Sequence, residues 1–235
     1  LDRDLTQKNI IPRQGGRHPL PDIKDFSETL GRLGISPGSH VVVYDDKNGA
    51  NAAARFWWML RAAGHEKIQV VDGGWGALQQ AGLPLEAGSP KVAFTTYPIE
   101  RWYLPMVTMQ EVEDRVKLPD YVLIDVREGY RYRGESEPID LVAGHIPGAI
   151  NVPYMDNLNS DGTFLSAHAL SQKYGDVLAG KDPAKVMVHC GSGVTACHTL
   201  LALEQAGIQG VSLYVGSWSE WSRNDKGIAQ SPGQD

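Results

Sequence analysis

The sequence contains two copies of one pattern, and this internal repeat limits the possible folds more than any other feature. In each copy an apolar, β-branched run leads into a short polar loop, a helix that ends in Ala-Gly, a second apolar run and a Gly-x-Trp motif; the copies are Val41–Leu85 and Val186–Ala229. Trp75 lies 11 residues after Gly64, and Trp218 lies 11 residues after Gly207. Because strands alternate with helices, we expect two tandem α/β domains, each a mostly parallel central sheet flanked by helices.

The first copy is shorter at its front than the second. Asp45 and Cys190 occupy equivalent positions, each two residues beyond an apolar run. In the second copy the expected strand Tyr121–Asp125 and the segment Gly144–Ala149 begin 69 and 46 residues before Cys190. Counted back from Asp45, both elements would fall before residue 1. We therefore expect a first domain that lacks its N-terminal part; the alternative is a domain that never had these elements.

These positions divide the chain into three parts. We expect a partial, non-catalytic N-terminal domain over residues 1–85, a linker over 86–105 and a catalytic C-terminal domain over 106–235. The linker is rich in proline and has no helical period, but its aromatic residues favour packing against the domains. Helices are expected at Asp22–Leu33, Ala52–Ala63, Thr108–Lys117, Ala167–Tyr174 and Val194–Ala206.

Composition excludes several classes of function. With 22 Lys and Arg against 28 Asp and Glu, the formal net charge is −6, so the chain offers no basic surface for nucleic acid or an anionic membrane. Its apolar runs are too short to span a bilayer. Seven histidines without ligand spacing and only two cysteines argue against a metal site and a disulfide framework. We expect no cofactor and a cytoplasmic location, although a missing N-terminus would remove any targeting segment.

The strongest chemical signal is the cysteine that follows the first apolar run of the second copy. Residues 186–197 read VMVHCGSGVTAC, which predicts a strand, a glycine-rich loop that begins at Cys190 and a helix. The amides of such a loop and of a helix N-terminus point at the sulfur and favour its thiolate form. Gly191 and Gly193 allow the loop to curl tightly. The pattern predicts that Cys190 is a nucleophile, whereas Asp45 at the equivalent place in the first copy indicates a scaffold.

Two other cysteine chemistries fit the spacing poorly. A cysteine phosphatase closes a similar loop with an arginine six residues after its nucleophile, because phosphate is held by a bidentate guanidinium; here that residue is Ala196. A dithiol redox motif needs Cys-x-x-Cys, but Cys197 lies seven residues after Cys190. We expect Cys197 to be a buried helix residue.

Several motifs of the second copy resemble the landmarks of the tandem-domain rhodanese family, in the family's order. They are Asp-Val-Arg at 125–127, Gly-His-Ile-Pro-Gly-Ala at 144–149, the cysteine loop and Gly-Ser-Trp at 216–218. The loop CGSGVTA is similar to that of 3-mercaptopyruvate sulfurtransferases. Thiosulfate-preferring members more often carry Cys-Arg-Lys-Gly-Val-Thr.

The resemblance implies an enzyme that moves a sulfur atom through a Cys190 persulfide. The donor would be 3-mercaptopyruvate or thiosulfate, and the acceptor a thiol or cyanide, with a protein thiol such as thioredoxin among the candidates. Two alternatives stay open, a thiosulfate-specific sulfurtransferase and a non-catalytic persulfide carrier.

The resemblance also assigns roles to individual residues. Cys190 and Ser192 would be catalytic, with Ser192 hydrogen-bonding or protonating the departing pyruvate enolate. Arg131 would bind the substrate carboxylate. The backbone from Gly191 to Ala196 would cradle the persulfide, so the substrate-binding residues are Arg131, Gly191, Gly193, Val194 and Thr195.

Two features depart from the family pattern. Members usually carry a second arginine after Glu-Pro, where this chain has Ile139. Arg133, expected in the same extended segment as Arg131, is a candidate to compensate for this missing cation. The histidine and acid of the family's proton relay are expected before residue 1.

Neighbouring residues are expected to have structural roles. Asp125 and Arg127 would form an ion pair or capping network beneath the site. His189 would be a packing residue that faces away from the active site. Trp218 would line the pocket.

Overall fold

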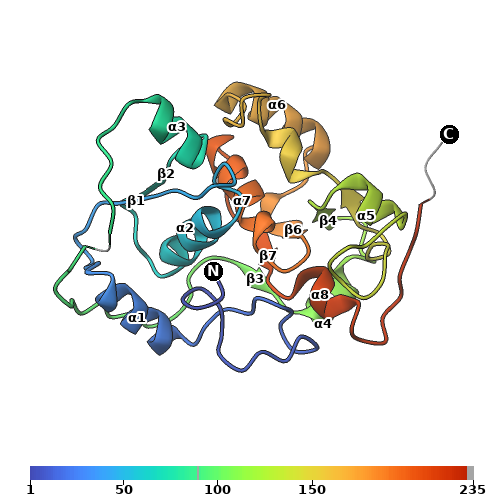
Figure 1. The fold of residues 1–235 in the computed structure, drawn as a ribbon. Coiled ribbons are helices and arrows are strands. Elements are labelled where there is room, and N and C mark those ends of the chain that lie inside the picture. Colours follow the sequence, from blue (N-terminus) through green and yellow to red (C-terminus); the bar gives the residue numbers. More distant parts are fainter. Residues whose placement is uncertain (89, 232–235) are drawn as a thin grey trace.

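The computed structural model describes residues 1–88 and 90–231, and within them the strands form two parallel sheets (Figure 1). The first sheet has two strands, β1 (Val41–Val43) and β2 (Ile68–Val70), with Val41 opposite Ile68. The second has five strands in the order β3-β7-β6-β4-β5, all pairs being parallel. The expected α/β class with mostly parallel sheets is confirmed.

Three helices accompany the first sheet, α1 (Ile23–Arg32), α2 (Ala52–Ala62) and α3 (Gly74–Gln80). The Asp22 carboxylate accepts a hydrogen bond from the Lys24 amide at 2.8 Å and so caps α1. Nearly every side chain of α2 is buried, because the helix contacts β1, β2 and the second unit together.

The second unit surrounds the larger sheet with helices. Its strands are β3 (Met106–Val107), β4 (Val122–Asp125), β5 (Ile150–Asn151), β6 (Val186–His189) and β7 (Ser212–Tyr214). Its helices are α4 (Met109–Arg115), α5 (Gly129–Arg133), α6 (Ala167–Leu178), α7 (Thr195–Gln205) and α8 (Ser217–Trp221), with 3-10 turns η1 (Tyr154–Asn157) and η2 (Pro183–Lys185). β6 is buried along its whole length in the centre of the sheet, which places Cys190 at its carboxyl end.

The two copies of the repeat have matching local structure. α2 and α7 both end before a left-handed glycine, Gly64 (φ 89°) and Gly207 (φ 78°). After each glycine the next amide bonds back to the helix, His65 to Leu60 and Ile208 to Leu203, which is the bond pattern of a Schellman cap. The Trp75 amide donates to the carbonyl of Asp45, as the Trp218 amide donates to that of Cys190. Asp45 and Cys190 are therefore structurally equivalent.

The two units pack together through α2 and α7 (Figure 1). One hydrophobic cluster runs across this contact and includes Trp57 and Trp58 from α2 with Leu200 and Leu203 from α7. A continuous buried core of this kind fixes the relative position of the two units.

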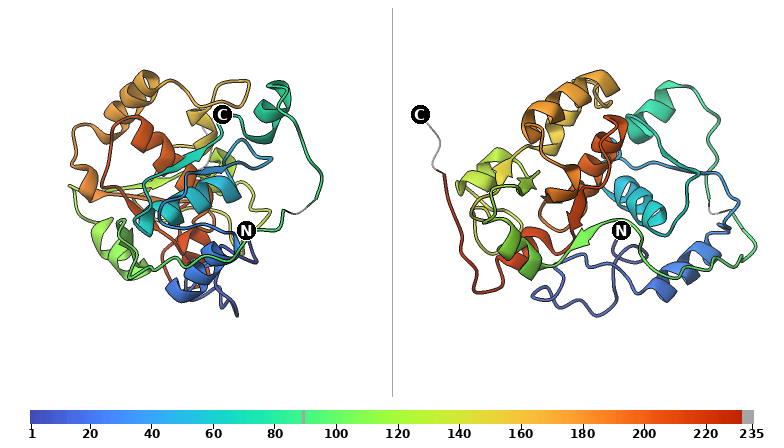
Figure 2. Two further views of the ribbon diagram at one scale, coloured as in Figure 1. Left: turned by 90° about the vertical axis from the view of Figure 1, so that its left-hand side faces the viewer. Right: turned by 180° about the vertical axis from the view of Figure 1, so that it is seen from behind.

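Part of the N-terminal segment (residues 1–22), namely residues 13–18, lies against the second unit although the segment belongs to the first in sequence (Figure 2). The Gly15 amide donates to Glu220 at 2.7 Å, and the Arg17 amide donates to the Ser219 hydroxyl at 3.0 Å. Gly16 has a positive φ of 81°, and a Cβ at this position would lie 2.6 Å from the Ser219 hydroxyl oxygen. Glycine is therefore required where the segment touches α8.

The segment between the units only partly packs as expected. Tyr97 is buried and Trp102 packs on Phe26 at a ring distance of 5.3 Å, whereas the side chains of Phe94 and Tyr103 are exposed. Of the predicted parts, the linker 86–105 includes Ser89 and the domain 106–235 includes 232–235, and these five residues lie outside the described ones.

Arg131 and Arg133 do not lie in an extended strand, as the sequence suggested, but in the short helix α5. Gly134 ends this helix in the left-handed region, at φ 88°. Most predicted helices agree with the structure within one or two residues, and α6 continues one turn beyond the expected end at Tyr174. No helix in residues 1–88 and 90–231 is both long and apolar enough to cross a membrane.

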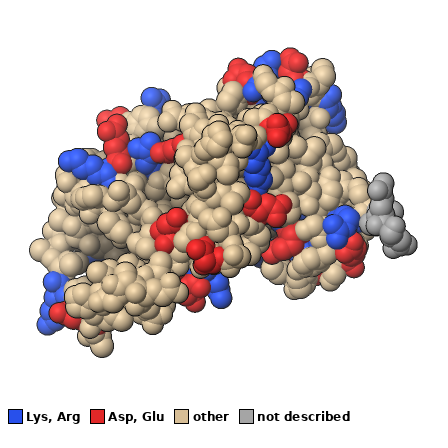
Figure 3. All heavy atoms as spheres, turned by 90° about the horizontal axis from the view of Figure 1, so that it is seen from above, with Lys and Arg blue, Asp and Glu red and all other residues tan. Residues whose placement is uncertain are grey.

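Acidic and basic side chains are interspersed on the face of the molecule that Figure 3 shows. That face carries no extended area of one charge, in agreement with the small net charge of the sequence.

Candidate active site

Cys190 lies at the carboxyl end of β6, where the loop to α7 begins. A cavity of about 200 Å³ opens at this point, and its wall includes Cys190, Ser192 and Arg131 from the second unit with Arg17 and His18 from the N-terminal segment. Gly191, Val194 and Thr195 also line it, so the structure brings together every predicted site residue except Gly193. The carboxyl ends of parallel strands are the usual place for ligand sites in α/β proteins.

The loop after Cys190 is held in a tight curl. Gly193 has φ 73°, and a Cβ there would overlap the carbonyl oxygen of Val215, so no other residue fits this position without strain. The Cys190 amide donates to the Ser217 hydroxyl at 3.2 Å, and the Ser219 amide donates to the Gly191 carbonyl at 2.8 Å. These bonds tie the loop to α8.

The corresponding loop of the first unit holds an anion. The Asp45 carboxylate accepts hydrogen bonds from four backbone amides, those of Lys47, Gly49, Asn51 and Ala53, at 2.8–3.0 Å. Asp45 is equivalent to Cys190, so the first copy of the repeat directs four backbone amides at the side chain that stands in the place of the cysteine.

Cys197 differs from Cys190 in its surroundings. Its thiol is fully buried and donates to the Gly193 carbonyl at 3.3 Å. Burial raises the pKa of Cys197 to about 12, despite the nearby charge of Arg55. Cys197 is a protonated, buried thiol at neutral pH, as the sequence predicted.

Ser192 lies beside a histidine that the sequence analysis missed. The Ser192 hydroxyl is 2.7 Å from His18 Nδ1, and His18 Nε2 is 3.1 Å from a carboxylate oxygen of Asp2. Burial and the charge of Arg17 lower the pKa of His18, whereas Asp2 opposes this shift. A neutral imidazole at pH 7 can accept a proton from Ser192 through Nδ1 while Nε2–H donates to Asp2.

The sequence placed a histidine and an acid of this kind before residue 1, whereas the structure has His18 and Asp2 in this arrangement beside Ser192. The count of residues followed the strands and helices of the repeat, whereas Asp2 and His18 lie in an irregular segment that reaches the other unit. The consecutive glycines Gly15 and Gly16 were the available signal, because adjacent glycines favour a close approach of backbone. They did not indicate which surface is approached.

Arg131 is held by carboxylates at the edge of the cavity. Its Nε and Nη2 donate to Glu137 at 2.8–3.1 Å, and its Nη1 donates to Glu128 at 3.2 Å. Burial disfavours the charged form of Arg131, but the hydrogen bonds to Glu137 and Glu128 outweigh the effect of burial and raise the pKa of Arg131. Ile139 lines the same cavity. Arg133 pairs with Glu135 at the surface and contributes no charge to the cavity wall.

Arg55 of α2 connects the two units behind the loop. Its side chain is fully buried, Nη1 donates to the Gly193 carbonyl at 3.0 Å and Nη2 to the His18 carbonyl at 2.9 Å. The same guanidinium group therefore fixes the cysteine loop and the backbone of the histidine that contacts Ser192. Sequence alone did not single out Arg55, because its partners are 138 and 37 residues away.

Beneath the loop lies the expected ion pair. Arg127 donates to Asp125 at 2.6 Å, and both side chains are buried. His189 is also buried, and its Nε2 is 3.7 Å from Asp125. Trp218 does not line the cavity as expected: its ring is fully buried, Arg127 stacks on it at 4.5 Å and its Nε1 donates to Val142.

Comparisons with known proteins identify the family. The model of the rhodanese-like domain matches residues 7–81 and 108–224. A probable 3-mercaptopyruvate sulfurtransferase of Pseudomonas aeruginosa is 43% identical over 94% of this chain and 78% of its own length. A putative thiosulfate sulfurtransferase of Mycobacterium tuberculosis is 42% identical over 94% of this chain and 77% of its own length.

A solved structure agrees with these relatives. The 3-mercaptopyruvate sulfurtransferase of Leishmania major has a TM-score of 0.81 and 31% identity, with 94% of this chain and 61% of that chain covered. This chain thus spans somewhat less than two thirds of the Leishmania chain. With its repeat, parallel sheets, cysteine loop and these relatives, the chain belongs to the rhodanese family.

Proposed function

We propose that the protein is a sulfurtransferase that takes sulfur from 3-mercaptopyruvate and passes it to a thiol through a persulfide on Cys190. The observation that carries the proposal is the convergence of Cys190, Ser192 with His18, and Arg131 on one cavity. These groups supply a nucleophile, a route for a proton and a cation for the donor's carboxylate.

The first half-reaction needs a thiolate and one proton transfer. The Cys190 thiolate attacks the sulfur of 3-mercaptopyruvate, the new S–S bond forms as the C–S bond breaks, and the bonding electrons leave with the enolate of pyruvate. The thiol proton of the donor passes through Ser192 and His18 to the enolate carbon. The products are pyruvate and an anionic persulfide, so atoms and charge balance.

The loop amides would stabilise the persulfide anion. The Asp45 carboxylate, held by four amides in the first unit, shows how such a loop accepts one negative charge. The first unit would then be non-catalytic, because its own carboxylate occupies the place of the sulfur. We propose the domain boundaries given above, with an N-terminal domain over residues 1–85, a linker over 86–105 and a C-terminal domain over 106–235.

In the second half-reaction an acceptor thiolate attacks the outer sulfur and releases the Cys190 thiolate. A small thiol, cyanide or a protein thiol of the thioredoxin kind would serve as acceptor. The chemistry needs reduced thiols, so we propose a reducing compartment such as the cytoplasm.

Thiosulfate is the alternative donor. It is favoured by the name of the Mycobacterium tuberculosis relative and by Ile139, which adds no cation for a carboxylate. A comparison of kcat/KM for the two donors distinguishes them, and we expect the higher value for 3-mercaptopyruvate.

Mass spectrometry tests the proposal directly. Incubation with 3-mercaptopyruvate should add the mass of one sulfur atom to Cys190, and addition of a thiol should give many turnovers of pyruvate. Cys190→Ser should abolish both results, whereas the matched Cys197→Ser variant should retain both, because a serine can still donate to Gly193. An adduct without turnover would indicate a carrier, and no adduct from either donor would contradict both functions.

A further inference from the structure

We propose that Arg17, in the N-terminal segment, binds the carboxylate of the sulfur donor together with Arg131. The proposal rests on the function proposed above and names a residue that decides which donors the site accepts. It assigns part of the substrate site to a segment that lies far from Cys190 in the sequence.

The two guanidinium groups converge on the loop next to the nucleophile. Both line the cavity. A Cβ built on Gly191 would lie 3.4 Å from Nη2 of Arg131 and 3.5 Å from Nη2 of Arg17. The two Nη2 atoms therefore approach the same point of the loop, one residue after Cys190. A small carboxylate in this cavity could accept hydrogen bonds from both.

Arg17 is the less neutralised of the two cations. The side-chain nitrogens of Arg131 all donate to Glu137 or Glu128. Arg17 has a bond from Nη1 to Asp140, and Arg223 shares the same oxygen of that carboxylate at 3.0 Å. A donor carboxylate would thus gain more from Arg17 than Arg131 alone can provide.

The position of Arg17 is fixed by the second unit. Its amide donates to the Ser219 hydroxyl, and Gly16 beside it fits against α8 only as glycine. The side chain of Asp140 is fully buried and contacts Arg17, Arg223 and Arg131; Nη2 of Arg131 is 3.6 Å from its second oxygen. A guanidinium anchored at one nitrogen keeps its other nitrogens in a defined direction, which favours recognition of a planar carboxylate.

Arg17 would supply the positive charge that the apolar side chain of Ile139 does not. Ile139 lies at the cavity with an exposed, apolar side chain. Arg17 comes from the N-terminal segment and Arg131 from the second unit, so the carboxylate would be held by both parts of the chain. Thiosulfate carries no carboxylate, and its use should depend less on Arg17.

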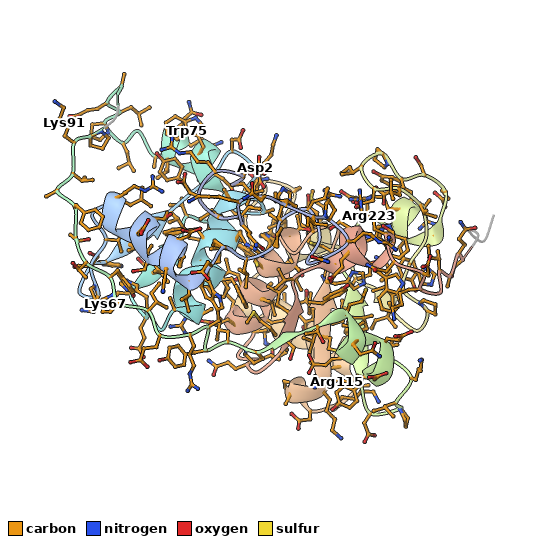
Figure 4. All side chains as sticks on the ribbon, turned by 90° about the horizontal axis from the view of Figure 1, so that it is seen from below. Asp2, Lys67, Trp75, Lys91, Arg115 and Arg223 are labelled. Atoms are coloured by element: carbon orange, nitrogen blue, oxygen red, sulfur yellow. The ribbon has the colours of Figure 1, made fainter. Side chains whose placement is uncertain are left out.

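The test compares two arginines that share one partner. Figure 4 labels Arg223 near the N-terminal segment; it also bonds Asp140 but does not line the cavity. Arg17→Met should raise KM for 3-mercaptopyruvate about tenfold to a hundredfold, as loss of a charge-assisted hydrogen bond predicts, with a small change in kcat. Arg223→Met removes an equivalent ion pair and should leave KM within about twofold of the wild-type value. Arg17→Lys should recover part of the loss.

Several outcomes would overturn the proposal. Equal rises of KM in Arg17→Met and Arg223→Met would show that Arg17 only supports Asp140. An equal loss with thiosulfate and with 3-mercaptopyruvate would show that no carboxylate is recognised. The proposed function fails separately, through absence of the Cys190 adduct in the wild-type protein. Thermal unfolding of each variant, together with Arg17→Lys, distinguishes a binding defect from a folding defect.

Discussion

Ser192 and His18 form the contact on which proton transfer would depend. His18 Nδ1 is 2.7 Å from the Ser192 hydroxyl, and the lowered pKa of His18 keeps the imidazole neutral at pH 7, able to receive a proton. Two groups that pass one proton act as a unit, so the losses of transition-state stabilisation caused by replacing each group should not add. This distinguishes a relay from two independent contacts with the donor.

We expect Ser192→Ala to lower kcat for pyruvate formation about a hundredfold with little change in KM, because it removes a positioned proton carrier. His18→Asn should have a similar effect. The double variant should be no slower than the slower single variant. Steady-state kinetics on all four proteins gives this comparison, and losses that multiply in the double variant would contradict a shared relay.

At the scale of elements, α7 carries a buried histidine that the proposed chemistry does not use. His198 is fully buried and stacks on Phe164 at a ring distance of 4.4 Å, and neither ring nitrogen has a hydrogen-bond partner within residues 1–88 and 90–231. Burial lowers the pKa of His198 from 6.5 to about 4, although the charge of Asp45 opposes the shift. The unfolded chain therefore binds this proton more readily than the folded protein, and stability falls as the pH decreases below 6.5.

Replacement of His198 by leucine should remove this pH dependence. Between pH 7.5 and pH 5 the wild-type protein should lose about 2 kcal/mol more unfolding free energy than His198→Leu, from the difference between the two pKa values. Urea unfolding of both proteins at the two pH values measures the difference. The other histidines are common to both proteins, so equal losses of unfolding free energy in the two proteins would mean that His198 does not contribute.

The local sequence pattern predicted most helices and strands, but not those whose formation depends on tertiary contacts. The periodicity of the strands around Val41 and Val186 and the Ala-Gly helix ends survive in the structure because they depend on nearby residues. α5 was missed, since its five residues carry no helical period. Two of its carbonyls, those of Arg131 and Arg133, accept hydrogen bonds from the amides of Gly144 and Ser231, both outside the helix.

At the scale of the whole molecule, the cavity is shared between the two units. The second unit provides Cys190 and its loop, predictable from one continuous motif, whereas Arg17, His18 and Arg55 reach the site across the interface. Their hydrogen bonds to the second unit join residues more than a hundred positions apart, as in the bond of His18 to Ser192. Sequence spacing holds no signal of such contacts, which explains why the sequence singled out Cys190 and not His18.

The shared cavity makes activity depend on the docking of the N-terminal segment. Gly16→Ala should undock it, because a Cβ would lie 2.6 Å from the Ser219 oxygen and the φ of 81° disfavours alanine. Arg17 and His18 would move with it, so kcat/KM for 3-mercaptopyruvate should fall about a hundredfold, as small displacements of catalytic groups can cause. The matched variant Gly38→Ala has no atom within 4 Å of its new Cβ and should behave as wild type. Circular dichroism and thermal unfolding should show both variants folded. Unchanged kinetics in a folded Gly16→Ala protein would mean that the second unit alone builds the active site.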